Sequence, residues 1–153
     1  MSKHSIAAIC MVAMAVALGS SNAWALEFRT ACAGSGEQFP GSGPSIPFHT
    51  VSNTLGHWIN ANTFKIDSGS LTVNAQGLVC SYTVDTSVTS TSVFSPDGTG
   101  TNDTTWKPAA GNSSSCEPEF TGHIAFTSTN ASGSLFVGID PGETASGSCV
   151  YGL

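Results

Sequence analysis

Apolar and polar side chains alternate most clearly over residues 62–85. Within this stretch, every second position from residue 78 onward is apolar or aromatic, at Leu78, Cys80, Tyr82 and Val84. A strand turns alternate side chains to opposite faces, so this run predicts a strand with one buried face. Two shorter runs repeat the alternation, with the apolar pairs Phe64 and Ile66, and Leu71 and Val73.

Turn-forming residues separate these three runs. Residues 67–69 read Asp-Ser-Gly, and residues 74–77 read Asn-Ala-Gln-Gly. Asp, Asn and Gly tolerate the backbone angles that tight turns require. We therefore expect a three-stranded antiparallel meander, and we expect it to form the core sheet.

A second alternating stretch, residues 119–139, predicts a β-hairpin. The small or apolar residues at every second position of its two arms are Phe120, Gly122, Ile124 and Phe126, then Leu135, Val137 and Ile139. Residues 130–133, Asn-Ala-Ser-Gly, supply the turn between the arms. Residues 148–153 predict a final strand, anchored by Cys149.

Two segments lack this alternation. Residues 26–50 are rich in Gly and Pro, which interrupt regular structure, so we expect an irregular loop with a short strand near Phe28. Residues 86–94, with Val88 and Val93, have the pattern of a strand. Residues 86–116 as a whole consist largely of Ser, Thr, Gly and Asn, which predicts a long exposed loop or a weak edge strand. A turn is expected at residues 95–98. Residues 53–60 are compatible with one helical turn, and no long amphipathic helix is expected.

Together these patterns predict an all-β fold, an antiparallel β-sandwich of about seven to nine short strands with long polar loops. We expect one domain over residues 26–153, a length that supports a single hydrophobic core. The side chains expected to line that core are Leu71, Val73, Leu78, Tyr82, Val84, Ile124, Phe126, Leu135 and Val137.

Residues 1–25 have the pattern of a signal peptide. A short polar and basic start precedes an apolar run over residues 6–18, and residues 23–25 read Ala-Trp-Ala. We expect Sec-type export and cleavage after Ala25. The alternative, an uncleaved anchor, is disfavoured because a spanning helix needs about 20 apolar residues. The mature protein is then secreted or periplasmic, with no membrane insertion after cleavage.

The charge of the chain argues against two classes of partner. Once residues 1–25 are removed, three basic residues remain against ten acidic residues, a net charge of −7. Nucleic acid binding requires basic residues that neutralise phosphates, so we expect no nucleic acid partner. An acidic chain is equally unsuited to an anionic membrane surface.

Four cysteines follow the signal segment, at Cys32, Cys80, Cys116 and Cys149. An even number in an exported chain predicts two disulfides, and four cysteines allow three pairings. We favour Cys32 with Cys80 and Cys116 with Cys149, because each bond then ties a terminal segment to a predicted strand. No two of them lie two to four residues apart, as zinc sites usually require, so we expect no metal site and no cofactor.

Catalytic chemistry finds little support in the sequence. The histidines of the mature chain are scattered: His49, His57 and His123. Glu117 and Glu119 could act as the paired carboxylates of a glycosidase, but Pro118 between them favours a loop. Residues 97–103 offer oxygen ligands of the kind that calcium prefers, but they lack the spacing of an EF-hand and are better explained as a polar turn.

Two tryptophans are the candidate binding residues. Trp58, next to His57, and Trp106 lie outside the clean alternating runs. An exposed indole ring can stack on a sugar or on a protein partner, and residues 95–115 surround Trp106 with hydroxyl and amide groups. The alternative for each ring is a plug in the core. The predicted contact residues are therefore Trp106, Trp58 and His57.

The spacing of Cys32 and Cys80 among alternating strands resembles that of fimbrial subunits and other small exported bacterial β-proteins. The resemblance covers spacing only. Residues 147–153 carry a cysteine where such subunits usually present a plain edge strand. The resemblance therefore assigns no family.

These observations predict a secreted, non-catalytic β-domain that acts by surface contact. Its partner is expected to be a glycan or a protein, or the domain contributes to a structure at a cell surface. The alternative is a small secreted hydrolase. That alternative requires histidines and carboxylates that converge in one pocket.

Overall fold

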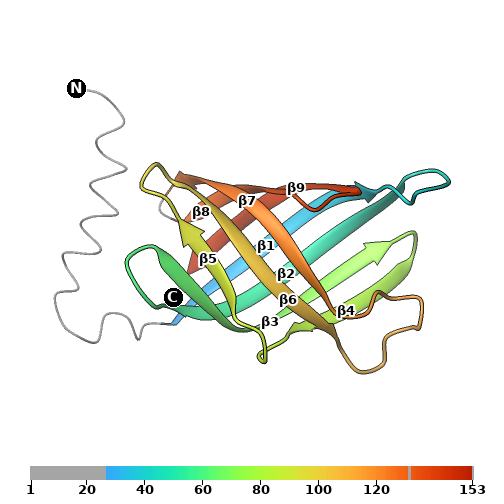
Figure 1. Cartoon of the computed structure of the whole chain (residues 1–153), viewed down its shortest axis with the longest axis horizontal. Helices are drawn as coiled ribbons and strands as arrows, with labels where there is room; N and C mark the ends of the chain where they lie inside the picture. Colours follow the sequence, from blue (N-terminus) through green and yellow to red (C-terminus); the bar gives the residue numbers. More distant parts are fainter. Residues whose placement is uncertain (1–26, 131, 153) are drawn as a thin grey trace.

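The computed structural model describes residues 27–130 and 132–152, and these residues form nine strands and no helix. Figure 1 shows the strands wrapped around a common axis. The strands are β1 (Glu27–Gln38), β2 (Ile46–Trp58), β3 (Thr63–Ala75), β4 (Leu78–Val84), β5 (Ser90–Phe94), β6 (Thr99–Pro108), β7 (Phe120–Asn130), β8 (Gly133–Gly138) and β9 (Glu143–Gly152).

All nine strands belong to one antiparallel sheet that closes on itself. The sheet has the order β2-β1-β9-β8-β7-β6-β4-β3, and β2 also pairs with β3. β4 and β5 share one position in this ring, because both pair with β3 on one side and with β6 on the other. Closure pairs every strand on both sides, which removes the unpaired edges that promote aggregation.

The predicted all-β antiparallel fold is confirmed. The strands form one continuous sheet rather than two separate sheets, because the first and last strands pair. β1 and β9 are in register from Arg29 opposite Gly152 to Gln38 opposite Glu143. The sheet therefore encloses its own core, and inward and outward side chains alternate along each strand.

The two turns predicted within residues 62–85 have different outcomes. The turn at residues 74–77 is confirmed, and Gln76 and Gly77 adopt the left-handed backbone with φ of 52° and 84°. The turn at residues 67–69 is wrong, because β3 continues through it. Ile66 pairs with Gly56 and Ser68 pairs with Leu55, so a β-bulge falls between them. The bulge shifts the alternation by one residue, which the sequence presents as a break.

Three predictions of irregular or helical structure are wrong. Most of residues 26–50 lies in β1 and β2, and residues 53–60 fall largely in β2 rather than in a helical turn. Within residues 86–116, β5 bears out the strand-like pattern of residues 86–94, but β6 replaces the expected exposed loop and pairs on both sides. Many inward positions of these strands carry glycine or hydroxyl side chains, such as Gly34, Gly36, Thr50 and Gly100, so the apolar alternation is weak.

The interior contains two clusters of buried side chains. One belongs to β3, β4 and β6, and its members are Phe64, Ile66, Leu71, Cys80, Tyr82, Val84 and Trp106. The other belongs to β7, β8 and β9, and its members are Phe126, Phe136 and Cys149. Half-buried Phe94 packs against both clusters and joins them.

Most of the predicted core is confirmed. Leu71, Tyr82, Val84 and Phe126 are buried, and Val73, Leu78 and Ile124 are half-buried against the clusters. Leu135 and Val137 were assigned to the core wrongly, since they are 57% and 51% exposed. Phe136, between them, occupies the inward position of β8, so its neighbours must face outward.

All four cysteines form disulfides, as predicted, but the favoured pairing is wrong. The bonds join Cys32 to Cys149 and Cys80 to Cys116. The pairing of β1 with β9 places Cys32 directly opposite Cys149, with their Cα atoms 4.0 Å apart. Sequence spacing does not reveal that the first and last strands are neighbours.

Two disulfides are consistent with an oxidising compartment outside the cytoplasm. The predicted signal peptide, residues 1–25, lies outside the described residues. The described part of the chain contains no helix with the length and hydrophobicity needed to cross a membrane.

Candidate functional site

Trp106 lies in the core rather than in an exposed loop. It belongs to β6, pairs with Phe120 of β7, and is only 6% exposed. The predicted loop is wrong because the inward positions before this ring are Gly100, Asn102 and Thr104, which carry no apolar signal. The alternative of a core plug correctly describes where this ring lies.

Trp58 and His57 are adjacent on β2, and neighbours on a strand point to opposite faces. The half-buried Trp58 ring packs 5.6 Å from the ring of Phe64 and 5.0 Å from that of Phe94, measured between centroids. The Nδ1 atom of His57 lies 2.5 Å from Oδ2 of Asp67. The two side chains therefore do not share a contact patch, and their binding roles stay predictions.

His123 is the histidine with the most defined surroundings. It lies on the outer face of β7, with Nδ1 2.6 Å from Oδ1 of Asp103 on β6. Its backbone N–H donates to Oδ2 of Asp140 at 2.9 Å. The hydrogen bond with Asp103 and the charge of Asp140 raise the pKa of His123. This arrangement ties the β8–β9 loop to β6 and β7.

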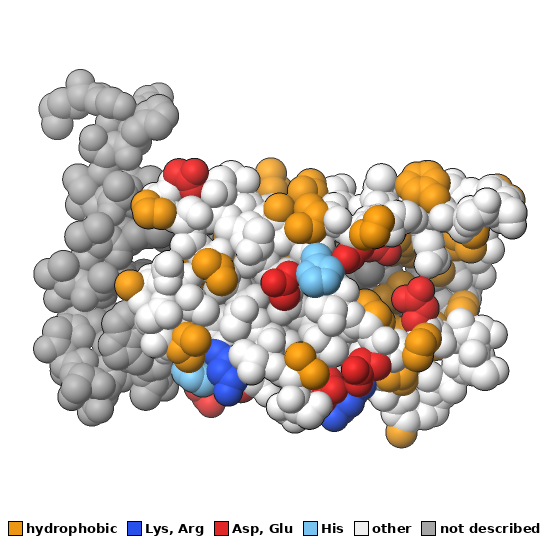
Figure 2. Space-filling model, in the orientation of Figure 1, with side chains coloured by type: hydrophobic (Ala, Val, Ile, Leu, Met, Phe, Trp, Pro, Cys, Tyr) orange, Lys and Arg blue, Asp and Glu red, His pale blue; other side chains and the backbone are white. Residues whose placement is uncertain are grey.

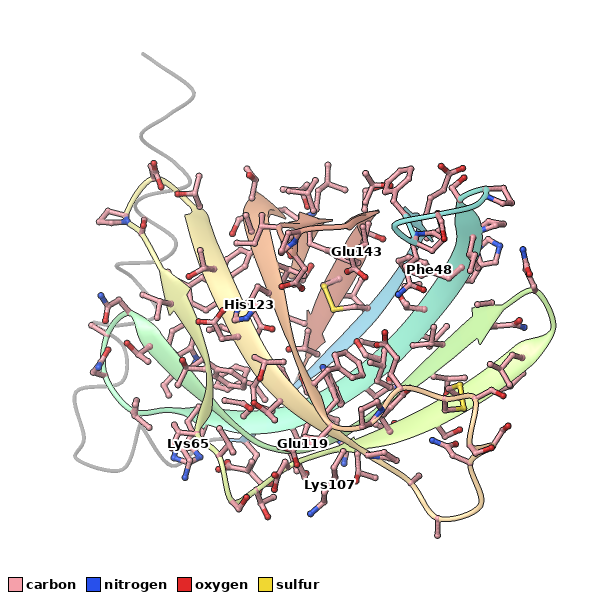
Figure 3. The ribbon with its side chains drawn as sticks, turned by 45° about the vertical axis from the view of Figure 1, so that its right-hand side comes forward. Phe48, Lys65, Lys107, Glu119, His123 and Glu143 are labelled. Atoms are coloured by element: carbon pink, nitrogen blue, oxygen red, sulfur yellow. A yellow bond between two sulfur atoms is a disulfide. The ribbon has the colours of Figure 1, made fainter. Side chains whose placement is uncertain are left out.

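Acidic side chains gather at the end of the closed sheet where β9 begins. Figure 3 shows Glu143 and Phe48 at this end. Burial, together with the charges of Asp140 and Glu117, raises the pKa of Glu143. Glu117 accepts a hydrogen bond from Nε2 of Gln38 at 3.3 Å. Glu117 is thus engaged with β1, and it lies in the loop that Pro118 predicted.

The acidic turn at residues 97–103 is held together internally. Oδ1 of Asp97 accepts hydrogen bonds from the backbone N–H and the hydroxyl of Thr99, at 3.0 and 2.7 Å. Asp103 is paired with His123. Within residues 27–130 and 132–152, no three His, Cys, Asp or Glu side chains are grouped so that they could hold a metal ion.

A surface cavity of about 480 Å³ lies over the end of β1 and the beginnings of β2 and β9. Hydroxyl groups, one carboxylate and one imidazole contribute to its lining. The lining residues are Ser35, Gly36, Glu37, Pro47, Phe48, His49, Thr144, Ala145 and Ser146. Six of the nine are exposed residues at outward positions of these strands, so the cavity opens on the outer face of the closed sheet.

Strand register brings the polar lining together in one short row. Ser35 of β1 stands opposite His49 of β2 on one side and opposite Ser146 of β9 on the other. Glu37 stands in the same way between Pro47 and Thr144. Neighbouring strands lie about 4.8 Å apart, so the side chains of each row can contact the same small ligand.

The sequence pattern does not predict this site. Glu37 and His49 lie in the segment that Gly and Pro mark as irregular, and His49 is one of the scattered histidines. The available signal is the exposed alternation Ser35, Glu37, Phe39. That alternation becomes informative only when residues 27–38 are recognised as a strand.

An apolar ridge adjoins the cavity on β8. We define the β8 ridge as Leu135, Val137 and Ile139, all of which are more than half exposed. Val137 stands opposite Ser146, which belongs to the cavity. The outer face thus changes within one strand spacing from hydroxyl groups to aliphatic side chains.

Comparison of the chain with models of known protein families, with curated proteins and with solved structures finds no match.

Proposed function

We propose that this protein is an exported, non-catalytic β-domain that acts by surface contact through the outer face of β1, β2 and β9. The observation that carries this proposal is the cavity over these three strands, whose lining presents outward hydroxyl, carboxylate and imidazole groups. Binding sites commonly combine a concave surface with a few placed polar groups. The strands beneath supply a rigid support, because each is paired on both sides.

Aromatic packing inside part of the closed sheet supports an outer site. Rings of Tyr82 and Phe120 stack edge to face at 5.0 Å, and those of Phe94 and Phe126 lie 4.7 Å apart. These side chains occupy the interior beside β4, β5 and β7. Contact with a partner therefore falls to the outer surface.

The distribution of ionisable groups supports a non-catalytic role. His57 pairs with Asp67 and His123 pairs with Asp103, and none of these four residues lines the cavity. A hydrolase needs a nucleophile or activated water, a base and an oxyanion site within contact of one substrate. No specific observation favours the hydrolase alternative.

Export is part of the same proposal. The pattern of residues 1–25 and the two disulfides support a secreted or periplasmic location. A hydroxyl-rich outer face suits contact in such a compartment. Figure 2 shows one face covered largely by backbone and uncharged polar side chains, with scattered hydrophobic, acidic and basic side chains.

The test is binding of the labelled, oxidised protein to arrays of immobilised glycans and extracellular proteins. Ser146→Arg fills the cavity with a long side chain, and we expect it to abolish the binding seen with the natural sequence. Thr83→Arg is the matched control, since Thr83 is exposed on β4, at the opposite side of the closed sheet. Equal binding by both variants, or no binding by the natural protein, would contradict the proposal.

A further inference from the structure

We propose that the cavity over β1, β2 and β9 is a sugar site that takes a neutral pyranose ring, with Phe39 as the stacking surface and Glu37 and His49 as the hydroxyl ligands. This inference rests on the proposed function and names the chemical class of its partner. The residues differ from those that the sequence suggested, because Trp106 is buried.

Phe39 is an exposed aromatic residue two positions beyond Glu37, which lines the cavity. It follows β1 directly, and its backbone N–H donates to the carbonyl of Gly142 at 2.7 Å, which extends the pairing of β1 with β9. The residue is 49% exposed. A rigid aromatic face of this kind suits the C–H groups of a sugar ring.

Glu37 and His49 supply the directional contacts. A carboxylate accepts two hydrogen bonds and forms stronger ones than a neutral acceptor, while an imidazole can both donate and accept. Ser35, Thr144 and Ser146 add hydroxyl groups on the same rows. A vicinal diol presents donors and acceptors together, so this mixed set matches it.

Charge and polarity separate a sugar from other ligand classes. Arg29, the basic residue of β1, stands opposite Leu55 and Gly152, several positions away from Glu37. Among the described residues, neither Lys nor Arg lines the cavity, and Glu37 repels anions, which disfavours phosphates and carboxylates. The hydroxyl-rich lining is equally unsuited to a lipid chain.

The site is built on a preorganised support. The Cys32–Cys149 disulfide joins β1 to β9 three positions from the opposed pair Ser35 and Ser146. Gly36 lies directly beneath, where a side chain would collide with the carbonyl of Thr144. The close approach of these strands holds the lining rows at fixed spacing, which reduces the entropy lost on binding.

The experiment is a titration of the oxidised protein, followed by amide chemical shifts, with glucose, galactose, mannose, N-acetylglucosamine and their short oligosaccharides. We expect one or more of them to shift residues 35–39, 47–49 and 144–146 selectively. Glucuronic acid is the anionic comparison and should bind more weakly. Phe39→Ala should weaken binding roughly tenfold, which corresponds to about 1.4 kcal/mol.

Glu37→Gln and Val51→Ala sharpen the test. Glu37→Gln keeps the shape of the side chain but removes its charge, so it should weaken sugar binding and reduce the discrimination against glucuronic acid. Val51→Ala alters an exposed outward residue of β2 outside the cavity and should leave binding unchanged. Shifts of similar size in the Phe39→Ala protein would overturn the stacking role and with it the inference.

The outcomes separate this inference from the proposed function. Absence of shifts with every sugar, combined with an array partner that Ser146→Arg abolishes, overturns the sugar assignment and leaves the contact surface in place. Absence of both overturns both. Sugar shifts confined to another face overturn the assignment of this cavity.

Discussion

On the β3 and β4 side of the closed sheet, and at Trp106 of β6, the strands fill the interior with their own large side chains. On the β1 and β9 side, many inward positions hold glycine, alanine or a cystine, and the ring of Phe136 from the neighbouring β8 covers part of this surface. Phe64, Leu71 and Trp106 represent the first construction. Gly34, Gly147 and the ring of Phe136 represent the second.

The register shows how the second construction works. Phe136 of β8 stands opposite Gly147 of β9, which stands opposite Gly34 of β1. A Cβ atom on Gly34 would lie 2.6 Å from Cζ of Phe136, so one ring covers two strands. Aromatic rings laid over cross-strand glycines restore the burial that glycine lacks. The comparison shows that a strand without large apolar side chains can have its inner face covered by a ring from the neighbouring strand. Its own sequence then does not mark it as a strand.

The largest expected effect comes from removing the disulfide that joins β1 to β9 on the glycine-rich side. Replacing Cys32 and Cys149 with Ala removes a link across 117 residues, and the chain-entropy model gives a loss of roughly 5 kcal/mol. Replacing Cys80 and Cys116 removes a link across 36 residues and should cost roughly 4 kcal/mol. Urea unfolding of both variants measures which of the two loses more stability. A greater loss from the shorter link would contradict the view that β1–β9 closure depends on its cystine.

Trp106→Ala tests the side built from large side chains. Removing a buried indole should lower the free energy of unfolding by about 3–5 kcal/mol. Trp58→Ala, at a half-buried ring, is the comparison and should cost less. The two midpoints in urea measure the difference. An unchanged midpoint for Trp106→Ala would mean that this ring does not support the core.

Gly147→Ala tests the ring-over-glycine construction directly. The added Cβ meets backbone of β1 and lies 2.7 Å from Cε1 of Phe136, so we expect a loss of about 1–3 kcal/mol. Gly152→Ala is the matched control on the same strand, since nothing lies within 4 Å of its added Cβ. Thermal unfolding compares the two, and similar melting temperatures would show that the Gly147 site can relax.

The smallest effect concerns Glu143, at the acidic end of the sheet. Its raised pKa means that folding favours the protonated form, so its contribution to stability is present below the unfolded value and is lost as pH rises through the folded pKa. Glu143→Gln should therefore raise the melting temperature at pH 7 by about 1–3 °C and change it little at pH 3. A gain in melting temperature that grew towards low pH would contradict burial of the charged Glu143 carboxylate as the cause.

The same contrast explains what could be predicted from the sequence. Residues 62–85 and 119–130 carry their own apolar alternation, so their strands were predictable. β1 and β6 carry Gly34, Gly36 and Gly100 at inward positions, so their sequence pattern indicates loops rather than strands. For the same reason the pattern does not indicate the site at Glu37 and His49. The cystine pairing was also beyond local patterns, because it follows from the contact between β1 and β9.

Closure of the sheet also has a consequence for the order in which the fold can be completed during synthesis. β1 needs β9 as a neighbour, and the two cysteines that join them are 117 residues apart in sequence. A chain emerging from its amino end therefore holds one edge of β1 unpaired until nearly all of the following strands exist. Contacts between such distant residues form slowly, and an unpaired edge invites wrong pairing in the interval. Assembly should thus depend on how quickly the final strand arrives and on the oxidant that then locks it in place.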